Sequence, residues 1–112
     1  MSKLNKFITS SSIIIVILLV ANSGLLSKPL EAGNPKNGQR MFEELLCTNC
    51  HGTRGEGSSA ANGGGPKLAP DPAPLSVYLE LVRRPRLNMP PYPEERASDQ
   101  DIADIHAYLK GL

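Results

Sequence analysis

The chain has 112 residues, which is enough for one small domain. Its formal net charge is +1, and no clustered basic face of the kind that binds nucleic acid is evident. Aromatic residues make up only 4% of the chain and tryptophan is absent. Once the N-terminal segment is set aside, about 80 residues remain, a size at which an apolar core alone gives marginal stability. The composition therefore favours a domain that needs a cofactor.

The N-terminus has the features of an export signal, which we expect to span residues 1–23. Two lysines precede an apolar run at 13–21, and Ala21-Asn22-Ser23 offers a small-x-small cleavage site. The alternative is an uncleaved membrane anchor, because residues 7–26 approach the length of a membrane span, although polar residues interrupt them. In both cases the domain is predicted to be periplasmic or otherwise extracytoplasmic, and it is tethered to the membrane in the second case.

Residues 24–33 are predicted to be a linker, and residues 34–112 to form a single domain. A helix is expected to begin at Asn34-Pro35, since asparagine is a good N-cap and proline is pre-organised for the first helical position. A helical stripe of apolar residues follows, at Met41, Phe42, Leu45 and Leu46. This helix is expected to run straight into Cys47.

The stretch Cys47-Thr48-Asn49-Cys50-His51 points most directly to chemistry. A cysteine, two spacers, a second cysteine and an adjacent histidine are the attachment signature of a c-type haem. On one turn of helix, two thiols can form thioethers with two vinyl groups on one porphyrin edge, and the histidine can offer an imidazole nitrogen to the iron. We therefore predict one haem c, attached through Cys47 and Cys50.

Residues 52–74 are rich in glycine, alanine and proline, so they cannot hold long helices or strands. We expect them to form a loop wrapped on the haem face. A short helix is predicted over residues 75–84, and the proline that follows ends it. Four prolines between 85 and 93 should keep the next segment extended and stiff.

The last predicted element is the best-marked helix. Ser98 is its N-cap, and Asp101 three residues later forms a variant of the capping box. Its buried stripe is expected to consist of Ile102, Ile105 and Leu109, with Tyr108 alongside. No strand pattern is found, so the fold is predicted to be all-α, with three or four helices around a cofactor.

With His51 on one side of the iron, a second axial position is open to three candidates. Met41 lies on the packed stripe of the first helix, and His106 is a lone histidine on the last helix. Met89 lies in the proline-rich segment, where its thioether can be held against iron with little conformational entropy to lose. Met89 is therefore the preferred second ligand, and its alternative role is that of a gap-filling core methionine.

Together these motifs resemble class I cytochrome c of the small monohaem bacterial type. The resemblance rests on an ordered set of motifs: Cys47-x-x-Cys50-His51, Gly65-Pro66-x-Leu68, Asn88-Met89-Pro90, Ser98-Asp99-Gln100-Asp101-Ile102 and Ala107-Tyr108-Leu109. It covers roughly residues 34–112. It implies a small cytochrome c fold wrapped around one covalently bound haem, with His51 and Met89 as the axial ligands of the iron.

The resemblance also implies roles for residues around the haem. Pro66 would offer its backbone carbonyl to the ring N–H of His51, as partners of metal-bound histidines commonly do. Leu68 would pack on the haem. Gly38 and Tyr108 would mark the close crossing of the first and last helices. Candidate partners for the haem propionates are Arg54, Arg83, Arg86, Tyr78 and Tyr92.

A six-coordinate iron leaves no position for a substrate, so one-electron transfer is favoured over catalysis. The expected partners are redox proteins, a dehydrogenase or reductase as donor and an oxidase or other protein as acceptor, met through a small interface. Leu87 and the run Pro90-Pro91-Tyr92-Pro93 are expected either to form the apolar rim of the docking surface or only to brace Met89. No nucleic-acid partner is expected, and a membrane is expected only if the N-terminal segment is retained.

Three alternatives remain open from the sequence. The domain could be the haem c subunit or dedicated acceptor of a periplasmic dehydrogenase. It could be a haem enzyme or sensor in which the bond from Met89 to iron is labile. Finally, the CxxCH motif could bind zinc together with His106, or its two cysteines could act as a dithiol catalyst.

Overall fold

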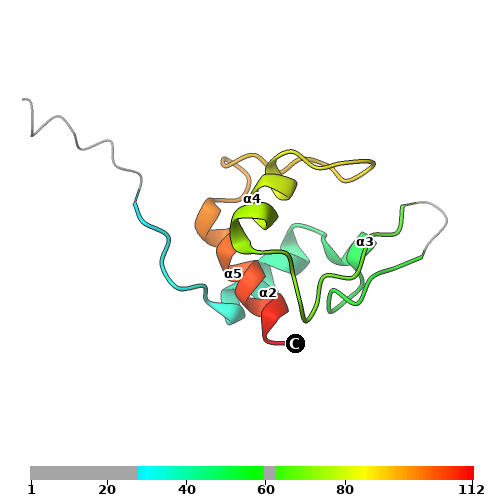
Figure 1. Ribbon diagram of the computed structural model, residues 1–112, viewed down its shortest axis with the longest axis horizontal. Helices are drawn as coiled ribbons and strands as arrows, with labels where there is room; N and C mark the ends of the chain where they lie inside the picture. The colour runs from blue at the N-terminus through cyan, green and yellow to red at the C-terminus, as the bar shows by residue number, and fades with distance from the viewer. Residues whose placement is uncertain (1–27, 60–62) are drawn as a thin grey trace, which may run out of the picture.

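The computed structural model describes residues 28–59 and 63–112 (Figure 1). Within these residues the secondary structure consists of helices, with no strand. The helices are α2 (Pro35–Glu44), α3 (Thr48–His51), α4 (Leu75–Arg83) and α5 (Asp99–Lys110). The predicted all-α class is confirmed. The predicted export signal lies outside the described residues, and none of the helices within them is long and apolar enough to cross a membrane.

Helix α2 begins where its capping residues predict. The side chain of Asn34 accepts hydrogen bonds from the backbone N–H groups of Lys36 and Asn37, and proline occupies the first helical position. These contacts satisfy two donors that the first turn of a helix would otherwise leave unpaired. The apolar side of α2 buries Met41 and Phe42 in the core, as the predicted stripe requires.

The prediction that this helix runs straight into Cys47 is wrong. Helix α2 ends at Glu44, and Leu46 adopts a φ of 62°, which an α-helix cannot accommodate. Leu45 remains buried, whereas Leu46 is 56% exposed and does not belong to the buried stripe. The backbone turns at this point, so that α3 begins in a new direction.

Helices α2 and α5 cross in the centre of the molecule (Figure 1). A Cβ atom added to Gly38 would lie 1.9 Å from the backbone oxygen of Asp104, so only glycine permits this approach. Beside it, the rings of Phe42 and Tyr108 are tilted against one another with their centroids 5.9 Å apart. The predicted close crossing of the first and last helices is confirmed.

A buried carboxylate holds the N-terminus of α2 on α5. Asp104 accepts hydrogen bonds from the backbone N–H of Asn34 at 2.8 Å, the side-chain amide of Asn37 at 2.7 Å and that of Gln100 at 3.0 Å. Burial raises the pKa of this carboxyl, but the three hydrogen bonds outweigh burial and hold the pKa below its ordinary value of 3.8. Asp104 is therefore ionised at neutral pH, and both of its carboxylate oxygens accept hydrogen bonds.

The last two helices complete the core. Helix α4 ends at Arg83, one residue earlier than predicted, and it packs against α5. The predicted capping box of α5 is confirmed, because Ser98 and Asp101 bond each other's backbone N–H groups. The buried stripe of α5 is also confirmed, and it consists of Ile102, Ile105 and Leu109.

We expect Asp104→Asn to destabilise the folded protein by about 1–3 kcal/mol at neutral pH, because the amide cannot accept all three hydrogen bonds. The folded-state pKa is depressed, so this contribution is complete above about pH 4 and disappears as the pH falls through the folded-state pKa. Denaturant titrations at several pH values measure the effect, with the exposed Asp71→Asn as control. An Asp104→Asn effect that does not change with pH would contradict the assignment.

Candidate functional site

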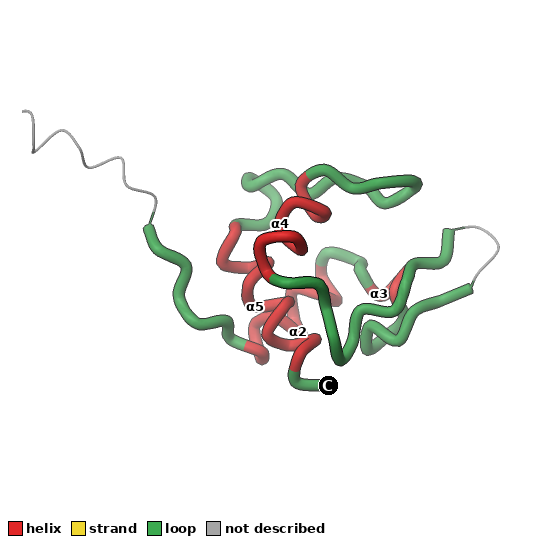
Figure 2. The backbone as a smooth tube through the Cα atoms, in the orientation of Figure 1, coloured by secondary structure: helices red, strands yellow, loops and turns green. Residues whose placement is uncertain are grey.

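A cavity of about 630 Å³ lies between α3, α4, α5 and the loop after α4. In the view of Figure 2, α4 and the loop that follows it lie above α3. The floor of the cavity includes Ile102 and Ile105 of α5, and further apolar side chains come from Leu45, Leu81 and Val82. Its volume falls within the range of about 300–1,000 Å³ that is usual for cofactor and ligand sites.

All of the predicted site residues border this cavity, although they come from three separate parts of the chain. They are Cys47, Cys50, His51, Pro66, Leu68 and Met89. The described parts of the predicted loop over residues 52–74 also reach the cavity, through residues 63–66, Leu68 and Ala73. The sequence therefore identified a set of side chains that the fold does bring together.

The two cysteines lie on one turn of helix. Cys47 is the residue before α3, and its carbonyl accepts the backbone N–H of His51 at 2.9 Å. Both side chains are half-buried and neither forms a disulfide. Burial raises the pKa of the Cys47 thiol to about 11. A reactive dithiol needs a lowered pKa, so this environment does not suit a thiol-disulfide catalyst.

His51 is buried, and one of its ring nitrogens has a fixed partner. Its Nδ1 lies 2.8 Å from the backbone oxygen of Pro66, which is the contact that the resemblance implies. A carbonyl oxygen can only accept a hydrogen bond, so in the neutral ring Nδ1 carries the proton and Nε2 carries the lone pair. This is the tautomer that a ligand binding metal through Nε2 requires.

Gly65 allows Pro66 to reach this position. Its backbone N–H donates to the carbonyl of Cys50 at 2.6 Å, so the loop lies directly against α3. A Cβ atom at Gly65 would lie 2.7 Å from Nδ1 of His51 and 3.0 Å from the carbonyl oxygen of Cys50. A side chain here would therefore push against the histidine ring.

The other candidate iron ligands are placed elsewhere. Met41 is buried among core residues on α2 and does not border the cavity. His106 directs Nε2 to the backbone oxygen of Ala73 at 2.8 Å and packs edge-on against Tyr78. Across residues 28–59 and 63–112, no three His, Cys, Asp or Glu side chains are grouped so that they could hold a metal ion. Met89, by contrast, borders the cavity and packs against the core.

The polar groups at the cavity wall differ from those predicted. Tyr78, Arg86 and Tyr92 border the cavity, whereas Arg54 and Arg83 do not. Arg96 also borders it and was missed, because an arginine in a turn carries no local signal of what it faces. The hydroxyl of Tyr92 is already bonded to a backbone carbonyl. Asn49 and Asn88 also border the cavity, and Tyr78, Arg86 and Arg96 are the tyrosine and arginine side chains there that can meet a charged part of a ligand.

Comparison with known proteins agrees with this geometry. Residues 33–109 match the model of a protein family described as cytochrome c oxidase, cbb3-type, subunit III. Cytochrome c-555 of Methylococcus capsulatus is 34% identical to the chain over 77 residues. That alignment covers 67% of this chain and 59% of the relative, so the chain spans about three fifths of the length of the protein it matches. No solved structure matches the chain.

The helical fold and the side chains around the cavity are those of a small c-type cytochrome, and the chain belongs to the family whose model matches residues 33–109. Membership of this family implies haem c as the cofactor. The fit is supported by the chain itself, because one apolar cavity brings together two thiols and a histidine with a fixed tautomer.

We expect Gly65→Ala to destabilise the protein by about 1–3 kcal/mol, because the added methyl group must displace the His51 ring or the Cys50 carbonyl. Denaturant unfolding measures the loss. Gly111→Ala is the matched control, since a Cβ there meets only ordinary contacts at 3.5 Å or more. Equal stabilities of the two variants would show that the loop moves aside without cost.

Proposed function

We propose that this chain carries one haem c, attached through Cys47 and Cys50 and ligated by His51 and Met89. Its function is to accept one electron from a reduced redox protein and to pass it to an oxidised one outside the cytoplasm. The proposal rests mainly on one observation, which is that a single apolar cavity is bordered by both thiols, by the oriented histidine and by the methionine.

A haem c bound in this cavity would supply an iron that changes between its ferrous and ferric states by one electron. The chain's own residues prepare the site for it. Pro66 holds Nδ1 of His51, so that Nε2 can act as a ligand. Leu68, Ile102 and Ile105 present apolar surface and exclude water. Tyr78, Arg86 and Arg96 are the proposed partners for the two carboxylates of the haem.

The choice of ligands favours an electron carrier over an enzyme. If His51 and Met89 both bound the iron, they would be its two protein ligands and would leave no position for a substrate. A thioether is a soft ligand that favours ferrous iron, and burial disfavours the additional charge of ferric iron. Both effects raise the reduction potential, which suits a protein that exchanges electrons with others.

The proposed docking surface surrounds the mouth of the cavity. Leu46 and Leu87 border the cavity and are 56% and 100% exposed, and Pro90 beside them is also exposed. The sequence left open whether the run that contains Tyr92 forms this rim or only braces Met89, and at 6% exposed Tyr92 does not contribute to the rim. An apolar rim of this kind suits brief contact with a redox partner through a small interface.

The proposed organisation of the chain is an export signal at residues 1–23, a linker at 24–33 and the haem domain at 34–112. The family match over residues 33–109 supports the bounds proposed for the haem domain. The description of that family as an oxidase subunit favours a second candidate function, in which the same domain carries electrons within a larger oxidoreductase. The donor and acceptor would then be neighbouring subunits instead of diffusing proteins.

The test uses the full chain produced in a bacterial host with haem-attachment machinery. The purified protein is expected to be red, and its colour should survive denaturing electrophoresis because the haem is covalently bound. The ferric form should show a far-red charge-transfer band from the thioether. The Met89→Leu variant should keep the colour but lose this band, because leucine has no atom that can bind iron.

Met41→Leu is the matched control and should keep the band, since Met41 does not border the cavity. A colourless wild-type protein would overturn the proposal. A red protein with a five-coordinate high-spin spectrum would retain the haem but exclude the Met89 bond, and would point to a haem enzyme or sensor.

A further inference from the structure

The loop that carries Met89 is held to the rest of the described molecule by hydrogen bonds at its C-terminal end and not along residues 85–91. Across residues 85–91 no hydrogen bond to any other part of the described chain is present, and the side chain of Leu87 is fully exposed. Tyr92, which follows directly, is buried, and its backbone N–H, its backbone carbonyl and its hydroxyl are all hydrogen-bonded. Met89 therefore lies on a segment whose nearest firm attachment is Tyr92.

Tyr92 is joined both to α4 and to the end of α2. Its backbone N–H donates to the carbonyl of Val82 at 3.1 Å, and its hydroxyl donates to the buried carbonyl of Leu45 at 2.8 Å. Leu45 lies two residues before Cys47. The same tyrosine thus connects the Met89 loop with the backbone that leads into the CxxCH motif.

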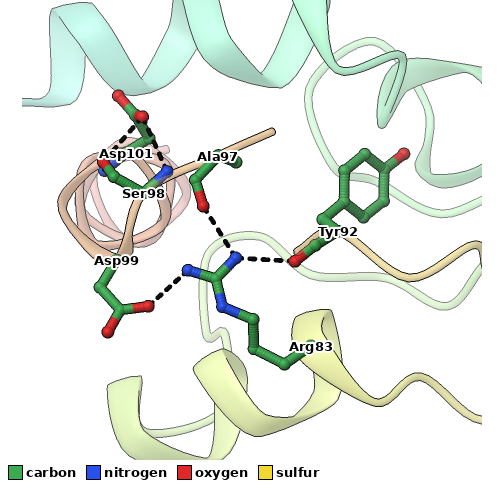
Figure 3. A network of polar contacts seen from close by, with 6 residues as sticks. All are labelled: Arg83, Tyr92, Ala97, Ser98, Asp99 and Asp101. Atoms are coloured by element: carbon green, nitrogen blue, oxygen red, sulfur yellow. Dashed lines mark hydrogen bonds and ion pairs between the residues drawn. The ribbon is translucent and has the colours of Figure 1, made fainter. Parts of the chain in front are cut away.

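Arg83, the last residue of α4, completes the attachment (Figure 3). Its guanidinium donates to the backbone oxygens of Tyr92 at 2.7 Å and Ala97 at 2.8 Å, and it forms an ion pair with Asp99. The arginine therefore spans both ends of the turn 92–97 and anchors it to the first residue of α5. We call Arg83 and Tyr92 the loop anchor.

Two prolines link the loop anchor to Met89. Pro90 and Pro91 each fix φ near −65°, so the chain between Met89 and Tyr92 has little freedom. On its other side, Met89 is preceded by residues 85–88, which make no hydrogen bond to the rest of the described chain, and Leu87 among them has a φ of 59°. The direction of Met89 is therefore set from its C-terminal side.

We propose that Arg83 and Tyr92 are positioning residues that hold the thioether of Met89 on the iron. This inference rests on the proposed ligation by His51 and Met89. Because the link through the two prolines is stiff, Met89 cannot move far from the cavity unless Tyr92 also turns and gives up its bonds to Leu45 and Arg83. Loss of either bond should therefore favour the detached state of Met89.

The test titrates the ferric holoprotein with imidazole and follows the loss of the far-red thioether band. Imidazole binds the iron only after Met89 has left, so its apparent affinity rises in proportion to the detached fraction. We expect Tyr92→Phe and Arg83→Gln each to tighten apparent imidazole binding by about tenfold, which corresponds to ~1.4 kcal/mol. Far-UV circular dichroism in denaturant gives the global stability of each variant in parallel.

Two controls remove the same chemical groups outside the loop anchor. Tyr108→Phe removes a hydroxyl that makes no hydrogen bond to any described residue. Arg84→Gln removes the arginine next to Arg83, whose guanidinium bonds Glu80 and no other residue of the described chain. Both should bind imidazole within about twofold of the wild type, because among the described residues neither side chain is hydrogen-bonded to the Met89 loop or to the loop anchor. If Tyr92→Phe fails to fold, Pro90→Ala combined with Pro91→Ala loosens the link while leaving the anchor contacts intact, and should also tighten imidazole binding.

The outcomes separate the inference from the proposed function. If Tyr92→Phe and Arg83→Gln lower the global stability but bind imidazole as the wild type does, the two residues are merely structural and the inference is overturned. If the wild type itself lacks the thioether band, ligation by Met89 fails and the inference fails with it. If the wild type shows the band and both variants bind imidazole more tightly, the result supports ligation by Met89 and also the positioning role of Arg83 and Tyr92.

Discussion

The close approach of α2 and α5 at Gly38 is the constraint on which the remaining structure depends. Because no Cβ atom separates the helices there, the two backbones are nearly in contact, and Asp104 holds the start of α2 beside them. This contact fixes the end of α2, where the turn at Leu46 leads into Cys47. The same helix α5 supplies Ile102 and Ile105 to the cavity. The helix crossing therefore sets the distance between the attachment motif and the floor of the cavity.

The parts of the fold that the sequence predicted are those encoded by neighbouring residues. Asn34 caps α2 and Ser98 caps α5 because each side chain reaches N–H groups only a few residues away. The break at Leu46 could not be predicted in this way. Leucine is a good helix former, so its propensity gives no sign of the φ of 62° at which the backbone turns. Local propensity was overridden by tertiary packing.

The candidate site shows the same division. The CxxCH motif was recognisable because covalent attachment demands a fixed spacing, and the contact of His51 with Pro66 followed from the family resemblance. Arg83 was interpreted as a possible haem contact but bonds two backbone carbonyls, and Arg96 was missed. Arginine has the same appearance in a sequence whether it faces solvent, a carbonyl or a ligand. Only the three-dimensional arrangement distinguishes these roles.

The two halves of the site differ in how firmly the protein holds them. The half that would form permanent bonds lies on a helical turn whose backbone is bonded to Gly65 and to α3 itself. The half that would supply an exchangeable ligand lies on a segment that makes no hydrogen bond to the rest of the described chain, so it depends on Tyr92 for its position. Segments with few such bonds open most easily. Substitutions in the Met89 loop should therefore alter the ligand's hold on iron without disturbing attachment of the haem. Among the described residues, the hydrogen bond that joins the segment after Met89 to the backbone before Cys47 is the one between Tyr92 and Leu45.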